Sequence, residues 1–464
     1  MSAAAFPPSF LWGAATAAYQ VEGGALADGK APSIWDVFCA IPGKTLRGDT
    51  GEVACDHYHR WREDIDLMRR LNLRAYRLSL SWPRVFPQGR GPVNERGWDF
   101  YDRLIDGLCA AGITPMVTLY HWDLPALLQF EMGGWAHPDI AHVFADYAEQ
   151  AFRRLGDRVP LWLTLNEPWV VVDGGYLHGV FPPGVKDRRE AYLAGHNLLR
   201  AHAQAVARFR AHGPRGGQIS FALNSAYYFP ATDSTDDKAA AERAVLNFAG
   251  WFADPPWFGD YPDIMRERLG DLLPRFSDED ARLLRRSVDF IALNYYTSDF
   301  VRHAPGHGLM DYEIVTPADI PRTEMNWPIL PDGLHGLLCW LSDRYGRLPV
   351  YITENGAAMP DAPDANGFVD DPDRIAYLRD HFSAAARAMR DGVDLRGYFV
   401  WSLMDNLEWT AGYTKRFGLI HCDRRTLRRT IKASGHWYAR VIASGELDAA
   451  PAPFHAAAGG GGAG

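Results

Sequence analysis

LWLTLNEPW, residues 161–169, begins as an apolar, β-rich run and ends abruptly in an Asn-Glu-Pro sequence. A second run, VYITENG (350–356), breaks off in the same way around Glu354. Short apolar runs bounded in this manner predict buried β-strands, so each strand delivers one glutamate at its end. Pro168 disfavours helix at the residue before it, and we therefore expect Glu167 to be extended. Two such strands suggest a pair of carboxylates that work together.

Similar runs recur along the chain with helical segments between them. We expect strands at 10–16, 74–81, 113–120, 161–166, 218–224, 289–296, 350–355 and 396–403. Residues 138–157 show the helical period, with Ile140, Phe144 and Tyr147 on one face. Eight strands alternating with helices favour an α/β fold, a single (β/α)8 TIM barrel with long insertions in its βα loops. The alternative, a doubly wound open sheet, lacks a Gly-rich phosphate turn after the first strand.

The barrel is expected to occupy residues 1–448 as one domain, because single barrels with insertions exceed about 400 residues. Segment 303–328 is rich in Pro, His and Gly with little periodicity, and loops of that length are usually functional or disordered. Residues 449–464 have low complexity and are expected to be a flexible tail.

Charge and cysteine content exclude several classes of protein. The net charge is −9 and both signs are mixed along the 464 residues, so nucleic acid is not an expected partner. The sequence shows neither a signal peptide nor an apolar stretch of about 18 residues, so no membrane association is expected. Five scattered cysteines without a C-x-x-C pair argue against disulfides and zinc knuckles and indicate a reducing, cytoplasmic location.

Aromatic residues make up 13% of the chain, including 16 tryptophans. Core packing accounts for most of them, but their flat faces also stack on the C–H faces of sugars.

Polar and aromatic side chains gather at the expected carboxyl ends of the strands, where TIM barrels place their active sites. They are Gln20, Arg77, His121, Trp122, Asn166, Glu167, Asn294, Tyr296, Glu354, Trp401, Glu408 and Trp409. A strand-end ion pair would explain one glutamate, but this explanation weakens with each further polar group on the same rim. The set suits acid/base chemistry on a neutral polyhydroxyl ligand.

The histidines and serines of the sequence do not form a recognised metal or nucleophile motif. CDHYHRW (55–61) contains Asp56, His57 and His59, but two histidines spaced by two face different sides of a helix, and Asp56 is interpreted as an N-cap. The chain has neither an H-E-x-x-H nor a G-x-S-x-G motif. We therefore expect no metal and no cofactor.

Six motifs occur in order between about residues 6 and 442: FLWGAATAAYQVEG, YHWDLP, TLNEP, NYYT, ITENG and WSLMDNLEW…GYTKRFGL. Together they resemble the retaining β-glycosidases of glycoside hydrolase family one. The ordered set is far more specific than any single motif.

The resemblance implies a role for each matching residue. Glu167 would be the general acid/base and Glu354 the nucleophile, with Arg77 beside it. The sugar hydroxyls would be held by Gln20, His121, Asn166, Glu408 and Trp409, with Trp401 as floor and Trp122 and Phe417 also in the binding site. Asn294 and Tyr296 would orient sugar and nucleophile, and Trp169 and Trp327 would flank the leaving group.

A retaining mechanism with these roles leads to two further expectations. Glu354 should stay ionised with help from Arg77 and Tyr296, and Glu167 should have a raised pKa. Retention requires the two carboxyl groups about 5–5.5 Å apart.

Glu408 would accept hydrogen bonds from free hydroxyls and repel a 6-phosphate, which favours unphosphorylated β-glucosides or short oligosaccharides, with β-galactosides or β-fucosides as secondary substrates. A 6-phospho-β-glucosidase and a catalytically silent sugar-binding barrel are the alternatives. A Schiff-base barrel would need a strand-end lysine, and the eight expected strands supply none. Val170 and Phe181 depart from the family pattern on the leaving-group side.

Overall fold

Eight parallel strands close into a barrel, which confirms the predicted TIM architecture. The computed structural model describes residues 6–447, so the expected tail, 449–464, lies outside the described residues. Each predicted strand is present and pairs with its neighbours in chain order. The barrel strands are β1 (Leu11–Ala15), β2 (Ala75–Ser79), β3 (Thr114–Tyr120), β4 (Leu161–Asn166), β5 (Gln218–Ser225), β7 (Ile291–Tyr295), β10 (Val350–Asn355) and β11 (Leu395–Trp401).

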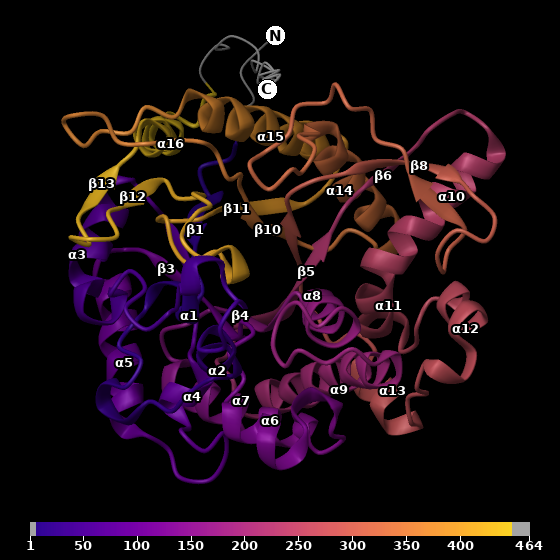
Figure 1. Cartoon of the computed structure of the whole chain (residues 1–464), viewed down its shortest axis with the longest axis horizontal. Coiled ribbons are helices and arrows are strands. Elements are labelled where there is room, and N and C mark those ends of the chain that lie inside the picture. Colours follow the sequence, from indigo (N-terminus) through magenta and orange to yellow (C-terminus); the bar gives the residue numbers. More distant parts are fainter. Residues whose placement is uncertain (1–5, 448–464) are drawn as a thin grey trace.

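Pairing of the first strand with the last closes the ring. β1 lies parallel to both β11 and β2, with Gly13 opposite Phe399 on one side and Ala75 on the other. In Figure 1 the colours run once around the molecule, so that the last elements lie beside the first. A Cβ on Gly13 would lie 2.5 Å from the Phe399 ring, so this position requires glycine for the ring to fit.

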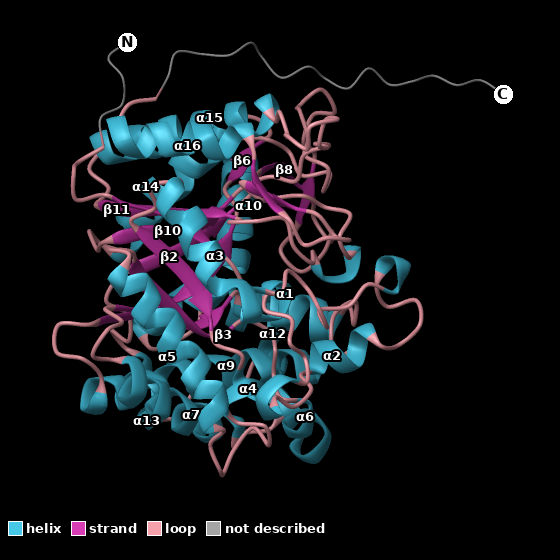
Figure 2. Ribbon diagram, turned by 90° about the vertical axis from the view of Figure 1, so that its left-hand side faces the viewer, coloured by secondary structure: helices cyan, strands magenta, loops and turns pink. Residues whose placement is uncertain are grey.

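Helices surround the barrel, and Figure 2 shows the strands enclosed between them. They are α1 (Ala18–Val21), α2 (Ile34–Cys39), α3 (His57–Arg70), α4 (Trp82–Val85), α5 (Glu95–Ala110), α6 (Ala126–Met132), α7 (Ile140–Leu155), α8 (Pro168–Val172), α9 (Arg188–His212), α10 (Thr235–Val245), α11 (Trp251–Phe258), α12 (Asp263–Leu269), α13 (Asp278–Leu284), α14 (Pro331–Tyr345), α15 (Pro372–Arg390) and α16 (Ala433–Ser444). The periodic face of 138–157 is confirmed, because Ile140, Phe144 and Tyr147 are buried on α7. Among residues 6–447, none of the helices combines the length and apolar character that a membrane crossing needs.

Buried side chains form two layers. A small cluster inside the barrel includes Met116, Leu161, Leu163 and Phe399, whereas Trp162 belongs to the larger cluster between strands and helices. This alternation follows from the period of two along a strand. Side chains at alternate positions of each strand therefore point into the barrel, and those at the carboxyl ends of the strands lie at its mouth.

The long insertions contain their own structure. Segment 303–328, expected to be a functional or disordered loop, includes β9 (Tyr312–Ile314), which pairs with β8 (Asp299–His303) and through it with β6 (Tyr228–Pro230). After β11 comes a small hairpin of β12 (Ile420–Cys422) and β13 (Arg429–Ile431).

The CDHYHRW segment has a structural role. His57 is buried and its Nδ1 lies 2.7 Å from Asp64, whereas His59 contacts Asp56 on the surface, so the two imidazoles face different sides as predicted. Asp56 does occupy the N-cap position of α3, but it adopts left-handed backbone angles and its side chain makes no capping hydrogen bond. The capping interpretation was therefore right in position and wrong in mechanism.

Candidate active site

A cavity of about 330 Å³ opens at the carboxyl ends of the barrel strands. Thirteen of the predicted site residues line it: His121, Trp122, Asn166, Glu167, Trp169, Asn294, Tyr296, Trp327, Glu354, Trp401, Glu408, Trp409 and Phe417. Gln20 and Arg77 lie next to this lining: Gln20 donates to Asn406 and to the Leu407 carbonyl in the loop that carries Glu408, and Arg77 donates to Glu354. The structure thus brings the whole predicted set together.

Both glutamates follow an irregularity in strand pairing. The register of β4 against β5 shifts between Leu163 and Asn166, and that of β10 against β7 shifts between Ile352 and Glu354. Such bulges insert an extra residue and re-aim the side chains that follow. They explain how both carboxylates turn into the barrel mouth.

The prediction that Glu167 is extended was wrong. The residue adopts φ 47° and ψ 64°, which lie in the left-handed region. Its N–H donates to the carbonyl of Ala222 over 2.9 Å, and α8 begins with Pro168 immediately after it. Pro168 does exclude right-handed helix at Glu167, but the hydrogen bond to β5 selects the left-handed alternative. Backbone strain of this kind is held by surrounding structure and clusters at functional sites.

Glu354 accepts two short hydrogen bonds from donors fixed by the barrel. Arg77 Nη1 lies 2.5 Å from Oε1, and the Tyr296 hydroxyl lies 2.6 Å from Oε2. Arg77 is itself held by the Thr118 hydroxyl and the Thr353 carbonyl. Both oxygens of Glu354 are therefore oriented, and its negative charge has a cation in contact.

Asn294 connects the two glutamates. Its Nδ2 donates to Glu167 Oε1 over 2.6 Å, and its Oδ1 accepts from the Thr353 hydroxyl over 2.7 Å and from Arg77 over 3.4 Å. Because Arg77 also donates to Glu354, the chain of contacts runs from one carboxyl group to the other through two side chains.

The two carboxyl groups differ in charge environment. Burial and the charge of Glu354 raise the pKa of Glu167 to about 8. Burial also raises the pKa of Glu354, but the Arg77 charge and the hydrogen bonds from Tyr296 and Arg77 oppose that rise. In the singly protonated pair the proton therefore resides on Glu167, which contacts no cation among residues 6–447, and Glu354 remains the carboxylate.

The proton on His121 can be assigned from its neighbours. Arg77 has only donors, and its Nη2 lies 2.6 Å from the oxygen of the Asn166 amide, so the amide nitrogen must face His121 Nε2, 3.0 Å away. Burial holds the pKa of His121 well below its usual range, so the ring is neutral with its proton on Nδ1. Nδ1 finds no hydrogen-bond partner within the described part of the chain and is free to donate to a ligand hydroxyl.

Gln20 and Glu408 offer acceptors. The Gln20 amide nitrogen donates to the Leu407 carbonyl over 2.7 Å, and its buried Oε1 finds no partner among residues 6–447. Burial, followed by the charge of Glu354, raises the pKa of Glu408 to about 8. A ligand that brings hydroxyl donors would satisfy both groups.

Aromatic rings form the walls of the cavity. On one side, the ring centroids of Trp122 and Trp409 are 4.5 Å apart, and the indole N–H of Trp122 donates to the Asn166 carbonyl over 2.9 Å. On the other side, the ring centroid of Trp327 lies 5.4 Å from that of Tyr296 and 6.3 Å from that of Phe417. Flat apolar walls around polar groups suit a ring with C–H faces and equatorial hydroxyls.

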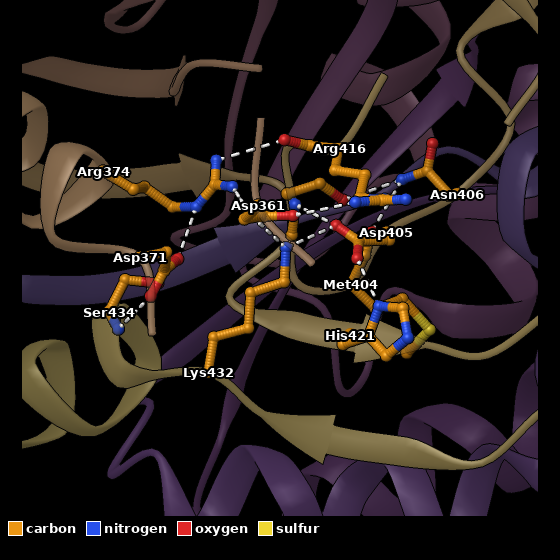
Figure 3. A network of polar contacts seen from close by, with 12 residues as sticks. Asp361, Asp371, Arg374, Met404, Asp405, Asn406, Arg416, His421, Lys432 and Ser434 are labelled. Atoms are coloured by element: carbon orange, nitrogen blue, oxygen red, sulfur yellow. Dashed lines mark hydrogen bonds and ion pairs between the residues drawn. The ribbon is translucent and has the colours of Figure 1, made fainter. Parts of the chain in front are cut away.

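A buried ionic network supports the loop 402–418, which carries several cavity residues (Figure 3). Lys432 Nζ lies 2.8 Å from both Asp361 and Asp405, and Arg374 contacts Asp361 and donates to the Arg416 carbonyl. Asp405 in turn accepts from the Gly418 N–H. The network therefore fixes both ends of this loop.

Sequence reasoning missed Asn224, Phe248 and Met325, which also line the cavity. Asn224 lies at the end of β5, the one predicted strand from which no rim residue was drawn, so the strand-end rule would have found it. Phe248 and Met325 come from insertions, where no periodicity marks an inward-facing side chain. Val170 and Phe181 line the cavity as well.

A metal ion is a poor fit to this site. The carboxylates already accept hydrogen bonds from Arg77, Tyr296 and Asn294, and the Arg77 guanidinium places a positive charge where a cation would have to lie. The arrangement instead provides one protonated carboxyl, one oriented carboxylate and a wall of hydroxyl-binding groups.

Known proteins resemble the chain over nearly its whole length. The model of Glycosyl hydrolase family 1 matches residues 2–447. The 1,4-beta-D-glucan glucohydrolase of Thermotoga neapolitana is 47% identical over 444 residues, 95% of this chain and 99% of that protein. Beta-glucosidase A of Thermotoga maritima is 46% identical over 450 residues, 97% and 100% of the two chains. A solved Thermotoga maritima family 1 glycoside hydrolase, complexed with a cyclophellitol analogue transition state mimic, has a TM-score of 0.92 at 46% identity and covers 97% of this chain and 100% of its own.

Proposed function

The chain belongs to glycosyl hydrolase family 1 and is a retaining β-glucosidase, and we propose that Glu354 and Glu167 carry out its chemistry. The observation that supports these roles is the unequal environment of the two groups. Glu354 has Arg77 in contact, whereas Glu167 has a pKa raised to about 8. A nucleophile must be ionised and an acid must be protonated at the same pH.

The reaction then proceeds in two displacements. Glu354 attacks the anomeric carbon while Glu167 gives its proton to the departing glycosidic oxygen, which leaves a covalent glucosyl ester and an alcohol. Glu167, now ionised, takes a proton from a water molecule as the oxygen of that water attacks the same carbon. The ester bond breaks and Glu354 is released as a carboxylate. The product keeps its β configuration because the carbon is inverted twice. We expect the two carboxyl groups about 5–5.5 Å apart, as this geometry requires.

The substrate is proposed to be an unphosphorylated terminal β-glucosyl residue. Gln20 Oε1 and Glu408 offer acceptors to hydroxyls, and His121 Nδ1 offers a donor. Where the Glu408 carboxyl group is ionised, a 6-phosphate beside it would meet like-charge repulsion, which disfavours a 6-phospho-β-glucosidase. β-Galactosides and β-fucosides remain secondary substrates in this proposal.

The leaving-group side is proposed to accept a further sugar, so that short oligosaccharides such as cellobiose are substrates. Trp169 packs edge-on against Phe248 with ring centroids 4.5 Å apart, and both line the cavity together with Trp327. Asn224 also lines it, and its buried Oδ1 lacks a hydrogen-bond partner in the described residues. These groups would sandwich a sugar ring and accept one of its hydroxyls.

A cytoplasmic location is part of the same proposal. All five cysteines are free thiols, three of them buried, which suits a reducing compartment.

The assigned roles can be separated by the stereochemistry of azide rescue. With a nitrophenyl β-glucoside, Glu354→Gly should lose hydrolysis by at least about 10⁴-fold, and azide entering from the vacated face should give the α-glucosyl azide. Glu167→Gly should still form the glucosyl ester with this activated substrate, and azide should then give the β-glucosyl azide. Exchanged products would reverse the roles, and an active Glu354→Gly variant without azide would refute them. The silent sugar-binding alternative predicts no turnover by the unaltered chain.

A further inference from the structure

A second group of ligand-type side chains lies away from the cavity, on the outside of the barrel. His335 and Cys339 are four residues apart on α14 and therefore face the same side one turn apart. Asp391, which follows the end of α15, completes the group. None of the three side chains belongs to the cavity lining or to the ionic network behind it.

The three ligand atoms converge. His335 Nε2 lies 2.6 Å from Asp391 Oδ2 and 3.7 Å from Cys339 Sγ, and all three atoms lie within 4.8 Å of one another. Around a tetrahedral zinc ion, a thiolate and an imidazole nitrogen are separated by about 3.5 Å, given Zn–S of about 2.3 Å and Zn–N of about 2.1 Å. The thiol and imidazole are therefore already at coordinating separation.

Only the carboxylate must move. An oxygen and a nitrogen ligand are about 3.3 Å apart in the same geometry, so the Asp391 hydrogen bond has to open by less than about 1 Å. The Asp391 side chain is 57% exposed and the His335 side chain 29%, so a small adjustment meets little packing resistance and an ion has access from solvent.

The charges favour a cation. Asp343 lies one further turn along α14, so two carboxyl groups, those of Asp391 and Asp343, lie near the Cys339 thiol. A divalent ion bound by the thiolate, the imidazole and Asp391 would displace the thiol proton and offset this negative charge.

A nucleophilic cysteine is a weaker explanation of the same group. In a Cys-His-Asp triad the acid binds one imidazole nitrogen and the thiol the other. Here Asp391 and Cys339 both face Nε2 of His335, an arrangement in which the three groups point at one centre.

We propose that His335, Cys339 and Asp391 form a binding site for a zinc-class divalent cation, which joins α14 to the end of α15. Water would complete the tetrahedron. A thiol and an imidazole select zinc or cobalt over calcium and magnesium, which require oxygen ligands. The sequence-based expectation of no metal rested on the CDHYHRW segment and on the lack of C-x-x-C and H-E-x-x-H motifs, none of which includes this H-x3-C pair.

Cobalt provides the direct test, because Co²⁺ bound to a thiolate gives a charge-transfer absorption. The full-length enzyme, stripped with a chelator, should take up one Co²⁺ per chain with this absorption, and Zn²⁺ should displace it and raise Tm. Cys339→Ser should lose the absorption and bind Zn²⁺ at least about tenfold more weakly. Cys109→Ser is the matched control, because it removes the exposed thiol of α5 and should behave as the unaltered chain.

The variants must be folded for this comparison, and their metal-free Tm and glucosidase activity should match those of the unaltered chain. Should Cys339→Ser fail this check, His335→Gln keeps the thiol and should lose affinity by a similar factor. Absence of the absorption in the unaltered chain, or its persistence in Cys339→Ser, would overturn the proposal.

Discussion

At the scale of single residues, two glutamates in one cavity are made different by their neighbours. Arg77 and Tyr296 donate to both oxygens of Glu354, whereas Glu167 receives one amide hydrogen bond. The difference depends on donors that come from β2 and from the residue directly after β7, far from either glutamate in the sequence. The different roles of Glu167 as acid and Glu354 as nucleophile therefore depend on the closed barrel, which brings these donors to Glu354.

The raised pKa of Glu167 predicts the pH dependence of the enzyme. kcat/KM should fall on the alkaline side with an apparent pKa near 8, as Glu167 loses the proton that the leaving group needs. It should also fall at low pH, when Glu354 becomes protonated. A pH–rate profile with a glucoside whose leaving group requires protonation measures both limbs. In Glu167→Gln the alkaline limb should disappear along with most of the activity. A flat profile through pH 8 would contradict the assignment.

Glu408 predicts substrate choice at the same scale. Above its pKa of about 8 the Glu408 carboxyl group is ionised, and there a replacement by Gln keeps the shape but removes the charge-assisted acceptor, which should lower kcat/KM for β-glucosides by about 10- to 100-fold, or roughly 1.5–3 kcal/mol. In the same pH range the penalty against 6-phospho-glucosides should shrink, because the repelling charge has gone. Kinetics with both nitrophenyl substrates give the ratio. A variant that loses both activities equally would show that Glu408 does not discriminate by charge.

Glu408 also links function to stability. Burial raises its pKa to about 8 in the folded chain, above the value near 4.5 of an unperturbed glutamate. Its contribution to stability is therefore complete below pH 4.5 and is lost as pH rises through 8. Relative to Glu408→Gln, the unaltered enzyme should lose Tm progressively across this interval. Thermal melts of both proteins at pH 5 and pH 9 test this, and a difference in Tm independent of pH would refute it.

At the scale of elements, the sequence predicted what depends on local pattern. All eight barrel strands and the helix at 138–157 follow from apolar periodicity, and the rim residues follow from their position at strand ends. The bulges before Asn166 and Glu354 could not be predicted, because they depend on how neighbouring strands pair. The left-handed Glu167 has the same origin, since a carbonyl of β5 selects it.

The ionic network around Lys432 supports the loop 402–418, so a change in this network should affect substrate binding. Replacing the fully buried Lys432 by Met leaves Asp361 and Asp405 without their shared cation, which should destabilise the fold by about 3–5 kcal/mol. Because the loop carries Glu408 and Trp409, KM for a β-glucoside should rise as well.

Thermal melts and kinetics measure both effects of the Lys432 change. Arg153→Met is the matched control, since it removes the exposed arginine of a surface ion pair with Glu149 on α7 and should change stability by under about 1 kcal/mol. A Lys432→Met variant as stable as this control would contradict the role of the network.

At the scale of the whole molecule, the first and last strands of the barrel are paired, so the strands form a continuous ring. β1 pairs with both β2 and β11, and a Cβ placed on Gly445 would lie 3.9 Å from the carbonyl oxygen of Phe6. The first and last described segments are therefore neighbours, and chain order matters less than ring order. Cavity residues come from the ends of six or more strands and depend on the ring being closed.

A circular permutant tests whether closure or chain order builds the site. Residues 447 and 6 would be joined by a short Gly-Ser linker, and the chain opened between the exposed Arg215 and Gly216, at the end of the barrel opposite the cavity. Since this turn carries no cavity residue, kcat/KM should stay within about threefold of the original. Opening the chain between Ala411 and Gly412 instead cuts the turn in which the Glu408 N–H donates to the Gly412 carbonyl, and should abolish activity while the barrel still folds. Equal activity of the two permutants would mean that the loop needs no continuous chain to place Glu408, and loss of folding in the first would mean that chain order directs assembly.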